Sequence, residues 1–79
     1  MPLTILLAAT LRKYLPGYDA AVGHGMPIEP GTTVRDIART LHIPEQEVKL
    51  IMVNGTHGDW DTVLNANDRL ALFPPVGGG

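Results

Sequence analysis

The segment from Gly31 to Leu41 most constrains the fold, because it has the apolar spacing of an amphipathic helix. Its apolar residues recur at i, i+3, i+4 and i+7, which places them on one buried stripe: Val34, Ile37, Ala38 and Leu41. Thr33 is placed to cap the first free amides, with Asp36 in the acidic position of a capping box. Pro44 is predicted to end the helix.

The segments before this helix are predicted to be strands. If residues 3–11 are extended, successive side chains point to opposite faces of a sheet. The odd-numbered face is then purely apolar: Leu3, Ile5, Leu7, Ala9 and Leu11. Leucine and alanine also favour a helix, but the β-branched residues in this run favour the strand. A second strand is expected within residues 19–28. Gly23 and Gly25 weaken it and predict an edge strand or a bulge.

The segments after the helix also predict strands. Residues 48–53 form a β-branched apolar run that predicts a buried central strand, closed by a turn at Asn54-Gly55. A loop over residues 56–61 and a short extended piece near Val63 precede the last strand, residues 69–73, with Leu70 and Leu72 inward. The predicted fold is an α+β mixed sheet of four to five strands with one main helix packed across it. The other face stays partly open, leaving Leu6, Ala8 and Phe73 available to a partner.

The composition excludes several classes of protein. A chain of 79 residues without cysteine makes one small domain with neither a disulfide nor a thiolate metal site. The net charge of -2 and the scattered basic residues argue against nucleic-acid binding. The apolar run from Leu3 to Leu11 is about half the length needed to span a bilayer. We therefore expect a cytoplasmic protein that binds neither nucleic acid nor membrane.

The sequence ends in Gly77, Gly78 and Gly79, directly behind Phe73-Pro74-Pro75-Val76. Residues without a Cβ can enter a narrow pocket that excludes other residues. Residues 74–79 can extend roughly 20 Å, and the prolines hold the base of this tail extended. The alternative is a frayed terminus, as chain ends often are.

Four stretches together resemble the MoaD/ThiS family of ubiquitin-like sulfur carriers. They are Ala9-Thr10-Leu11-Arg12 with Tyr14-Leu15-Pro16-Gly17, the helix opening at residues 31–36, the strand end Val53-Asn54-Gly55, and residues 68–79. The resemblance implies a β-grasp (ubiquitin-like) fold, with residues 1–73 as a single domain and residues 74–79 as an extended C-terminal tail ending in Gly-Gly.

The resemblance also implies a function. Gly79 would be adenylated and converted to a thiocarboxylate, while Gly77 and Gly78 let the tail thread into a partner. The partners would be a ubiquitin-activating-type adenylating enzyme, a sulfur donor and a sulfur-accepting synthase subunit. ATP would be used by the activating partner, and no cofactor would be bound. The chain would be a carrier or the small non-catalytic subunit of a sulfurtransferase complex, with docking contacts at Phe73, Pro74, Pro75, Val76, Leu6 and Ala8.

Alternatives remain open for the pathway and the use of the tail. The Phe-Pro-Pro-Val run favours molybdenum or tungsten cofactor (molybdopterin) biosynthesis over the thiamine pathway. A ubiquitin-like modifier joined to lysines needs the same tail, and a β-grasp interaction module would leave the tail inert. No catalytic residue and no metal site are expected: the chain has no serine or cysteine, and His57 with Asp59 and Asp61 gives an incomplete ligand set.

Overall fold

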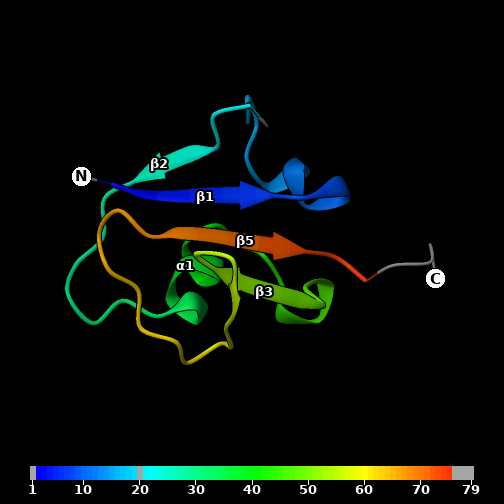
Figure 1. Ribbon diagram of the computed structural model, residues 1–79. Coiled ribbons are helices and arrows are strands. Elements are labelled where there is room, and N and C mark those ends of the chain that lie inside the picture. Colours follow the sequence, from blue (N-terminus) through cyan, green and yellow to red (C-terminus); the bar gives the residue numbers. More distant parts are fainter. Residues whose placement is uncertain (1, 20, 76–79) are drawn as a thin grey trace.

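The computed structural model describes residues 2–19 and 21–75, which form a mixed sheet with one α-helix across it (Figure 1). The strand order is β2-β1-β5-β3-β4. The strands are β1 (Leu3–Leu7), β2 (His24–Met26), β3 (Leu50–Val53), β4 (Thr56–His57) and β5 (Arg69–Phe73). The helices are α1 (Val34–Thr40) and the 3-10 helices η1 (Ala9–Tyr14) and η2 (Glu45–Glu47). None of the helices within these two described ranges is long and apolar enough to cross a membrane.

The two strands in the middle of the sheet come from distant parts of the sequence. β1 and β5 run parallel, with Ile5 beside Leu70 and Leu7 beside Leu72. β2 is antiparallel to β1, and β3 is antiparallel to β5. Parallel neighbours need a long crossover connection, and here α1 lies within it. This confirms the predicted mixed sheet and the edge position of the second strand.

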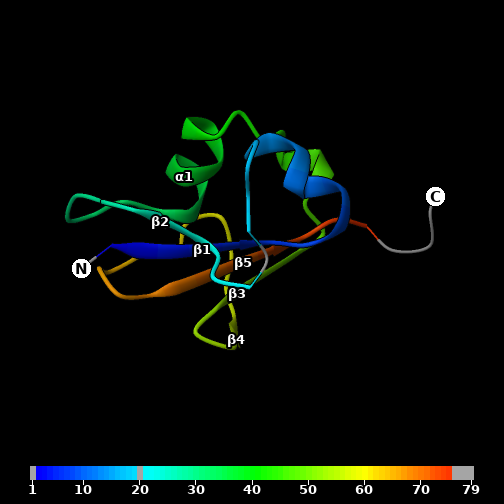
Figure 2. The ribbon, with the colours of Figure 1, turned by 90° about the horizontal axis from the view of Figure 1, so that it is seen from above.

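One face of the sheet carries the hydrophobic core. The residues of β1 and β5 that point to this face are buried, as strand alternation requires. Figure 2 shows α1 and the 3-10 helices on this same side of the sheet. The core consists of Leu3, Ile5, Leu7, Leu11, Val34, Ile37, Ala38, Ile43, Ile51, Leu64, Leu70 and Leu72.

The first strand is shorter than predicted. It ends at Leu7, and Ala9 begins η1 with a φ of 49°. The expectation of a strand through Leu11 is therefore wrong. Leu11 is still fully buried, because the 3-10 helix brings its side chain back to the core, whereas Ala9 is exposed. Alternation over nine residues cannot distinguish a strand from a strand followed by a tight helical turn.

The helix begins as predicted and ends earlier. The Thr33 hydroxyl accepts from the Asp36 amide, and the Asp36 carboxylate accepts from the Thr33 amide, which completes the capping box. The helix ends before Pro44 because His42 adopts a φ of 61°. The Ile43 amide then donates to the Ala38 carbonyl at 2.8 Å. This 6→1 bond is typical of a Schellman motif, which satisfies carbonyls at the helix end.

The turn predicted at Asn54-Gly55 is confirmed, but the central position of β3 is not. Asn54 and Gly55 have φ values of 54° and 80°, as a type I′ turn requires. They connect β3 to β4, which lies in the segment predicted to be a loop. β5, not β3, is central, and Ile51 alone among the four residues of β3 is buried. An apolar run shows that a strand is hydrophobic but not that it is buried on both faces. Here Leu50 and Met52 lie on the open face of the sheet.

Candidate functional site

The end of β5 directs the chain away from the sheet. Phe73 is the last residue of β5, and its carbonyl accepts from the Lys49 amide at 2.8 Å. Pro74 and Pro75 follow at the edge of the described residues. The predicted tail residues Val76, Gly77, Gly78 and Gly79 lie outside the described residues. The structure therefore fixes the root of the tail at the C-terminal end of the central strand.

The sheet face opposite the core is apolar around this root. Leu6 lies beside Ala71, which in turn lies opposite Met52. In the next row Phe73 lies opposite Leu50. All five side chains are half-buried, and no helix in the part of the chain that the structure describes covers them. The open face predicted from the sequence is therefore present, and it extends onto β3.

A hollow of about 270 Å³ opens on this face at the C-terminal ends of β1 and β5. Three residues predicted as docking contacts line it together: Leu6, Ala8 and Phe73. Their meeting follows from the parallel pairing of β1 with β5. Arg12 and Tyr18 line the same hollow, and neither was predicted.

Arg12 and Tyr18 are both bound to Leu7. The Leu7 amide donates to the Tyr18 hydroxyl at 2.9 Å, and Arg12 Nε donates to the Leu7 carbonyl at 3.3 Å. The amides of Thr4 and Ala8 donate toward β5, so the polar atoms of Leu7 point to the other side, where the pairing with β2 does not extend beyond Ile5. The two side chains thus replace a missing strand partner, since an unpaired backbone group at a sheet edge needs one.

The sequence gives only a weak signal for these two residues. Arg12 belongs to the one adjacent basic pair in the chain, and Tyr18 follows the Pro16-Gly17 turn. Their convergence depends on η1, which replaces the predicted end of the first strand. A correct assignment of η1 would have placed Arg12 near the end of β1.

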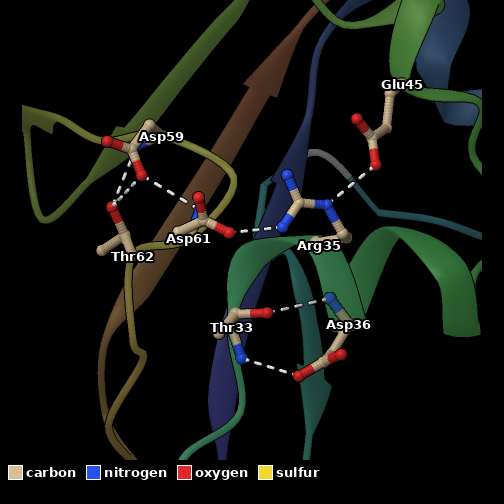
Figure 3. Close-up of polar contacts among 7 residues, drawn as sticks. All are labelled: Thr33, Arg35, Asp36, Glu45, Asp59, Asp61 and Thr62. Atoms are coloured by element: carbon tan, nitrogen blue, oxygen red, sulfur yellow. Dashed lines mark hydrogen bonds and ion pairs between the residues drawn. The ribbon is translucent and has the colours of Figure 1, made fainter.

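A second polar cluster lies on the helix side of the molecule (Figure 3). Arg35 donates hydrogen bonds to the carboxylates of Asp61 and Glu45. These hydrogen bonds raise the pKa of Arg35, and the one to Asp61 has the larger effect. The amides of Val34 and Arg35 donate to the carbonyls of Thr62 and Trp60 at 3.1 and 3.0 Å. These contacts fasten the segment before β5 to the start of α1, so we assign this cluster a structural role.

His57 lies in β4 and is exposed, and Trp60 follows it three residues later. Trp60 is half-buried and packs against the core. Among the described residues, no group of three or more histidine, cysteine or acidic side chains could hold a metal ion.

Comparisons with known proteins agree with this fold. The Haloferax volcanii protein solved in solution matches with a TM-score of 0.75 at 22% identity, covering 100% of this chain and 87% of that one. A Pyrococcus furiosus structure, provisionally described as molybdopterin converting factor subunit 1, matches with a TM-score of 0.68 at 24% identity, covering 96% of this chain and 99% of that one. At these identities the likeness shows the shared β-grasp fold.

Sequence comparisons show the family. A molybdopterin synthase sulfur carrier subunit from Dictyostelium discoideum is 34% identical over 82 residues, which covers 95% of this chain and 93% of that protein. Residues 20–79 match the ThiS family. The chain therefore belongs to the ThiS family, as its resemblance to the MoaD/ThiS sulfur carriers predicted.

Proposed function

We propose that this chain carries sulfur as a thiocarboxylate on Gly79 and donates it in molybdopterin biosynthesis. The observation that carries the proposal is the 34% identity, over 95% of the chain, to a molybdopterin synthase sulfur carrier subunit. The root of the tail supports it independently. Phe73 ends the central strand, so a tail that continues from Pro74 can leave the sheet without unfolding any strand.

The chemistry requires an activated carboxyl group, because a carboxylate is a poor electrophile. A Gly79 carboxylate oxygen attacks the α-phosphorus of ATP and pyrophosphate leaves, which gives an acyl adenylate. Hydrosulfide released by the sulfur donor then attacks the carbonyl carbon, AMP leaves and the proton of the hydrosulfide is lost to the solvent. The resulting thiocarboxylate sulfur is transferred to the acceptor held by the synthase, and the carboxylate is regenerated with oxygen from water.

In this chemistry the chain acts as a carrier: its tail brings Gly79 into the active sites of the partner enzymes. The activating enzyme would hold ATP, and the synthase subunit would hold the sulfur acceptor. Two glycines before Gly79 give the tail a narrow cross-section, because they have no side chain to clash with a pocket. Pro74 and Pro75 lower the entropy lost when the tail enters that pocket.

Intact-mass analysis tests the proposal. The chain is incubated with ATP, a sulfur donor and the adenylating enzyme of its own cell. We expect a mass gain that corresponds to replacement of one oxygen by sulfur, localised to Gly79 by fragmentation. A variant that lacks residues 77–79 is the control: it no longer ends in Gly-Gly and should gain nothing. An unchanged mass for the wild-type chain contradicts the carrier proposal.

The receiving pathway needs a separate measurement. The thiocarboxylated chain is mixed either with the large molybdopterin synthase subunit and its substrate, or with the thiazole-forming machinery of thiamine synthesis. Sulfur loss only in the first mixture supports the proposal, and loss only in the second assigns the chain to the thiamine pathway. Lysine-linked adducts recovered from cells would identify a modifier.

A further inference from the structure

The hollow beside Phe73 contains hydrogen-bond donors that the described residues do not satisfy. The Tyr18 oxygen already accepts from the Leu7 amide, so its hydroxyl hydrogen is left to donate. Arg12 uses Nε on the Leu7 carbonyl, which leaves the two terminal nitrogens of its guanidinium. Among the described residues, the ion pairs involve Lys13 and Arg35 and none joins Arg12 to a carboxylate.

These donors are held in place by the backbone. Both side chains form hydrogen bonds with backbone atoms of one residue, Leu7, at the end of β1. The side chain of Leu7 is itself buried in the core. Arg12 and Tyr18 are therefore both tied to the backbone at the end of β1. Fixed donors lose little conformational entropy on binding, so they favour a ligand more than free surface side chains would.

The surroundings indicate what the donors bind. The other side chains that line the hollow are apolar, among them Leu6, Ala71 and Phe73. An arginine fork matches a carboxylate, and a neighbouring hydroxyl can donate a further hydrogen bond to it.

We propose that the hollow receives an Asp or Glu side chain of the large synthase subunit, bound by Arg12 and Tyr18 while apolar neighbours of that side chain cover Leu6 and Phe73. The inference rests on the proposed function, because it assigns the hollow to the partner that takes sulfur from the tail. The inference adds a contact at the root of the tail, where a docked partner lies against the chain. This contact is separate from the sulfur-carrying end. Recognition at this point would select the partner before the tail reacts.

Binding of the full chain to the purified large synthase subunit tests the inference. Affinity is measured by calorimetry at low and at physiological salt for the wild type, Arg12→Gln, Arg12→Lys and Tyr18→Phe. Arg39→Gln is the matched control, because it removes the same charge from the exposed side of α1. We expect Arg12→Gln to weaken binding roughly tenfold to a hundredfold, with a smaller loss for Arg12→Lys and a change within about twofold for Arg39→Gln.

A charge exchange then identifies the partner residue. Arg12→Glu should abolish binding, and one Asp→Arg or Glu→Arg substitution in the large subunit should restore it. Circular dichroism of each variant shows whether it is folded, and Arg12→Lys keeps the test valid if Arg12→Gln does not fold. This inference alone is overturned if Arg12→Lys and Arg12→Gln bind the subunit as tightly as the wild type does. It is also overturned if no substitution in the large subunit restores binding to Arg12→Glu. A wild-type chain that does not bind the subunit overturns the assignment to molybdopterin synthesis as well.

Discussion

Asn54 and Asp68 are hydrogen-bonded to each other, with Asn54 Nδ2 donating to Asp68 Oδ1 at 2.9 Å. The pair joins the β3–β4 turn to the residue that precedes β5. Asn54 also accepts from the Arg69 amide at 2.9 Å, and Asp68 accepts from the Asn65 amide at 2.8 Å. One exposed pair therefore links two turns that are 14 residues apart in sequence.

This pair predicts a dependence of stability on pH. The hydrogen bond from Asn54, followed by that from the Asn65 amide, lowers the pKa of Asp68 below its ordinary value of 3.8. A carboxylate with a lowered pKa in the folded state stabilises the fold above its unfolded pKa, and this contribution is lost as pH falls through the folded pKa. We expect Asp68→Ala to lower the free energy of unfolding by roughly 1 kcal/mol at neutral pH, and by less in strong acid.

Urea unfolding of a double-mutant cycle checks this expectation. Asn54→Gly removes the partner side chain and still tolerates the positive φ of that turn. The double variant should lose less stability than the two single losses added together. Strict additivity would show that the two side chains do not interact.

The capping box predicts an asymmetry between two threonines of the helix. Thr33→Ala removes the hydroxyl that accepts from the Asp36 amide, so we expect a loss of roughly 1 kcal/mol. Thr33→Ser keeps the cap and should lose much less. Thr40→Ala is the control, because its hydroxyl only donates to a helix carbonyl, and its effect should stay within about 0.5 kcal/mol. Equal losses at Thr33 and Thr40, measured in urea, would contradict the assigned cap.

Gly23 and Gly17 have similar backbones and different surroundings. Their φ values are 77° and 81°, so an alanine at either position is strained. At Gly23 a Cβ would also lie 2.9 Å from side-chain atoms of Leu6 and Thr4, while nothing lies within 4 Å of that position at Gly17. We expect Gly17→Ala to cost roughly 1 kcal/mol and Gly23→Ala to cost distinctly more. Thermal unfolding of the two variants under the same conditions measures the difference.

Leu72 and Phe73 are adjacent and point to opposite faces of the sheet. Leu72 is fully buried, so Leu72→Ala should lower stability by about 2–5 kcal/mol. Phe73 lines the open hollow, so Phe73→Ala should lower stability less but weaken binding to the large synthase subunit. Urea unfolding and calorimetry on both variants separate the two effects. A Phe73→Ala variant that binds as tightly as wild type would remove Phe73 from the docking surface.

The parts of this fold that the sequence predicts are those with a local cause. The spacing of Val34, Ile37 and Ala38 and the hydrogen bonds of the capping box act within a few residues. The same is true of the turn at Asn54-Gly55. Each of these elements begins or turns where the sequence indicates.

The features of the fold that could not be predicted from the sequence depend on contacts between residues far apart in the chain. Ala9 leaves the strand conformation because η1 has to bring Leu11 back to the core. The helix ends at Thr40, and His42 after it is left-handed, a conformation that no local preference of histidine requires. Leu6, Ala8 and Phe73 could be assigned to one open face from alternation. Arg12 and Tyr18 join them only because the pairing with β2 does not extend to Leu7.

The parallel pairing of β1 with β5 has a consequence for the synthesis of the protein. β1 leaves the ribosome before β5, its central neighbour at residues 69–73, so Leu3, Ile5 and Leu7 stay without that neighbour until nearly all of the described sequence has emerged. Contacts of such long sequence separation also slow folding. A nascent chain that is released before residue 73 cannot complete the sheet, so we expect truncated products to expose the apolar residues of β1 and to be cleared by proteases.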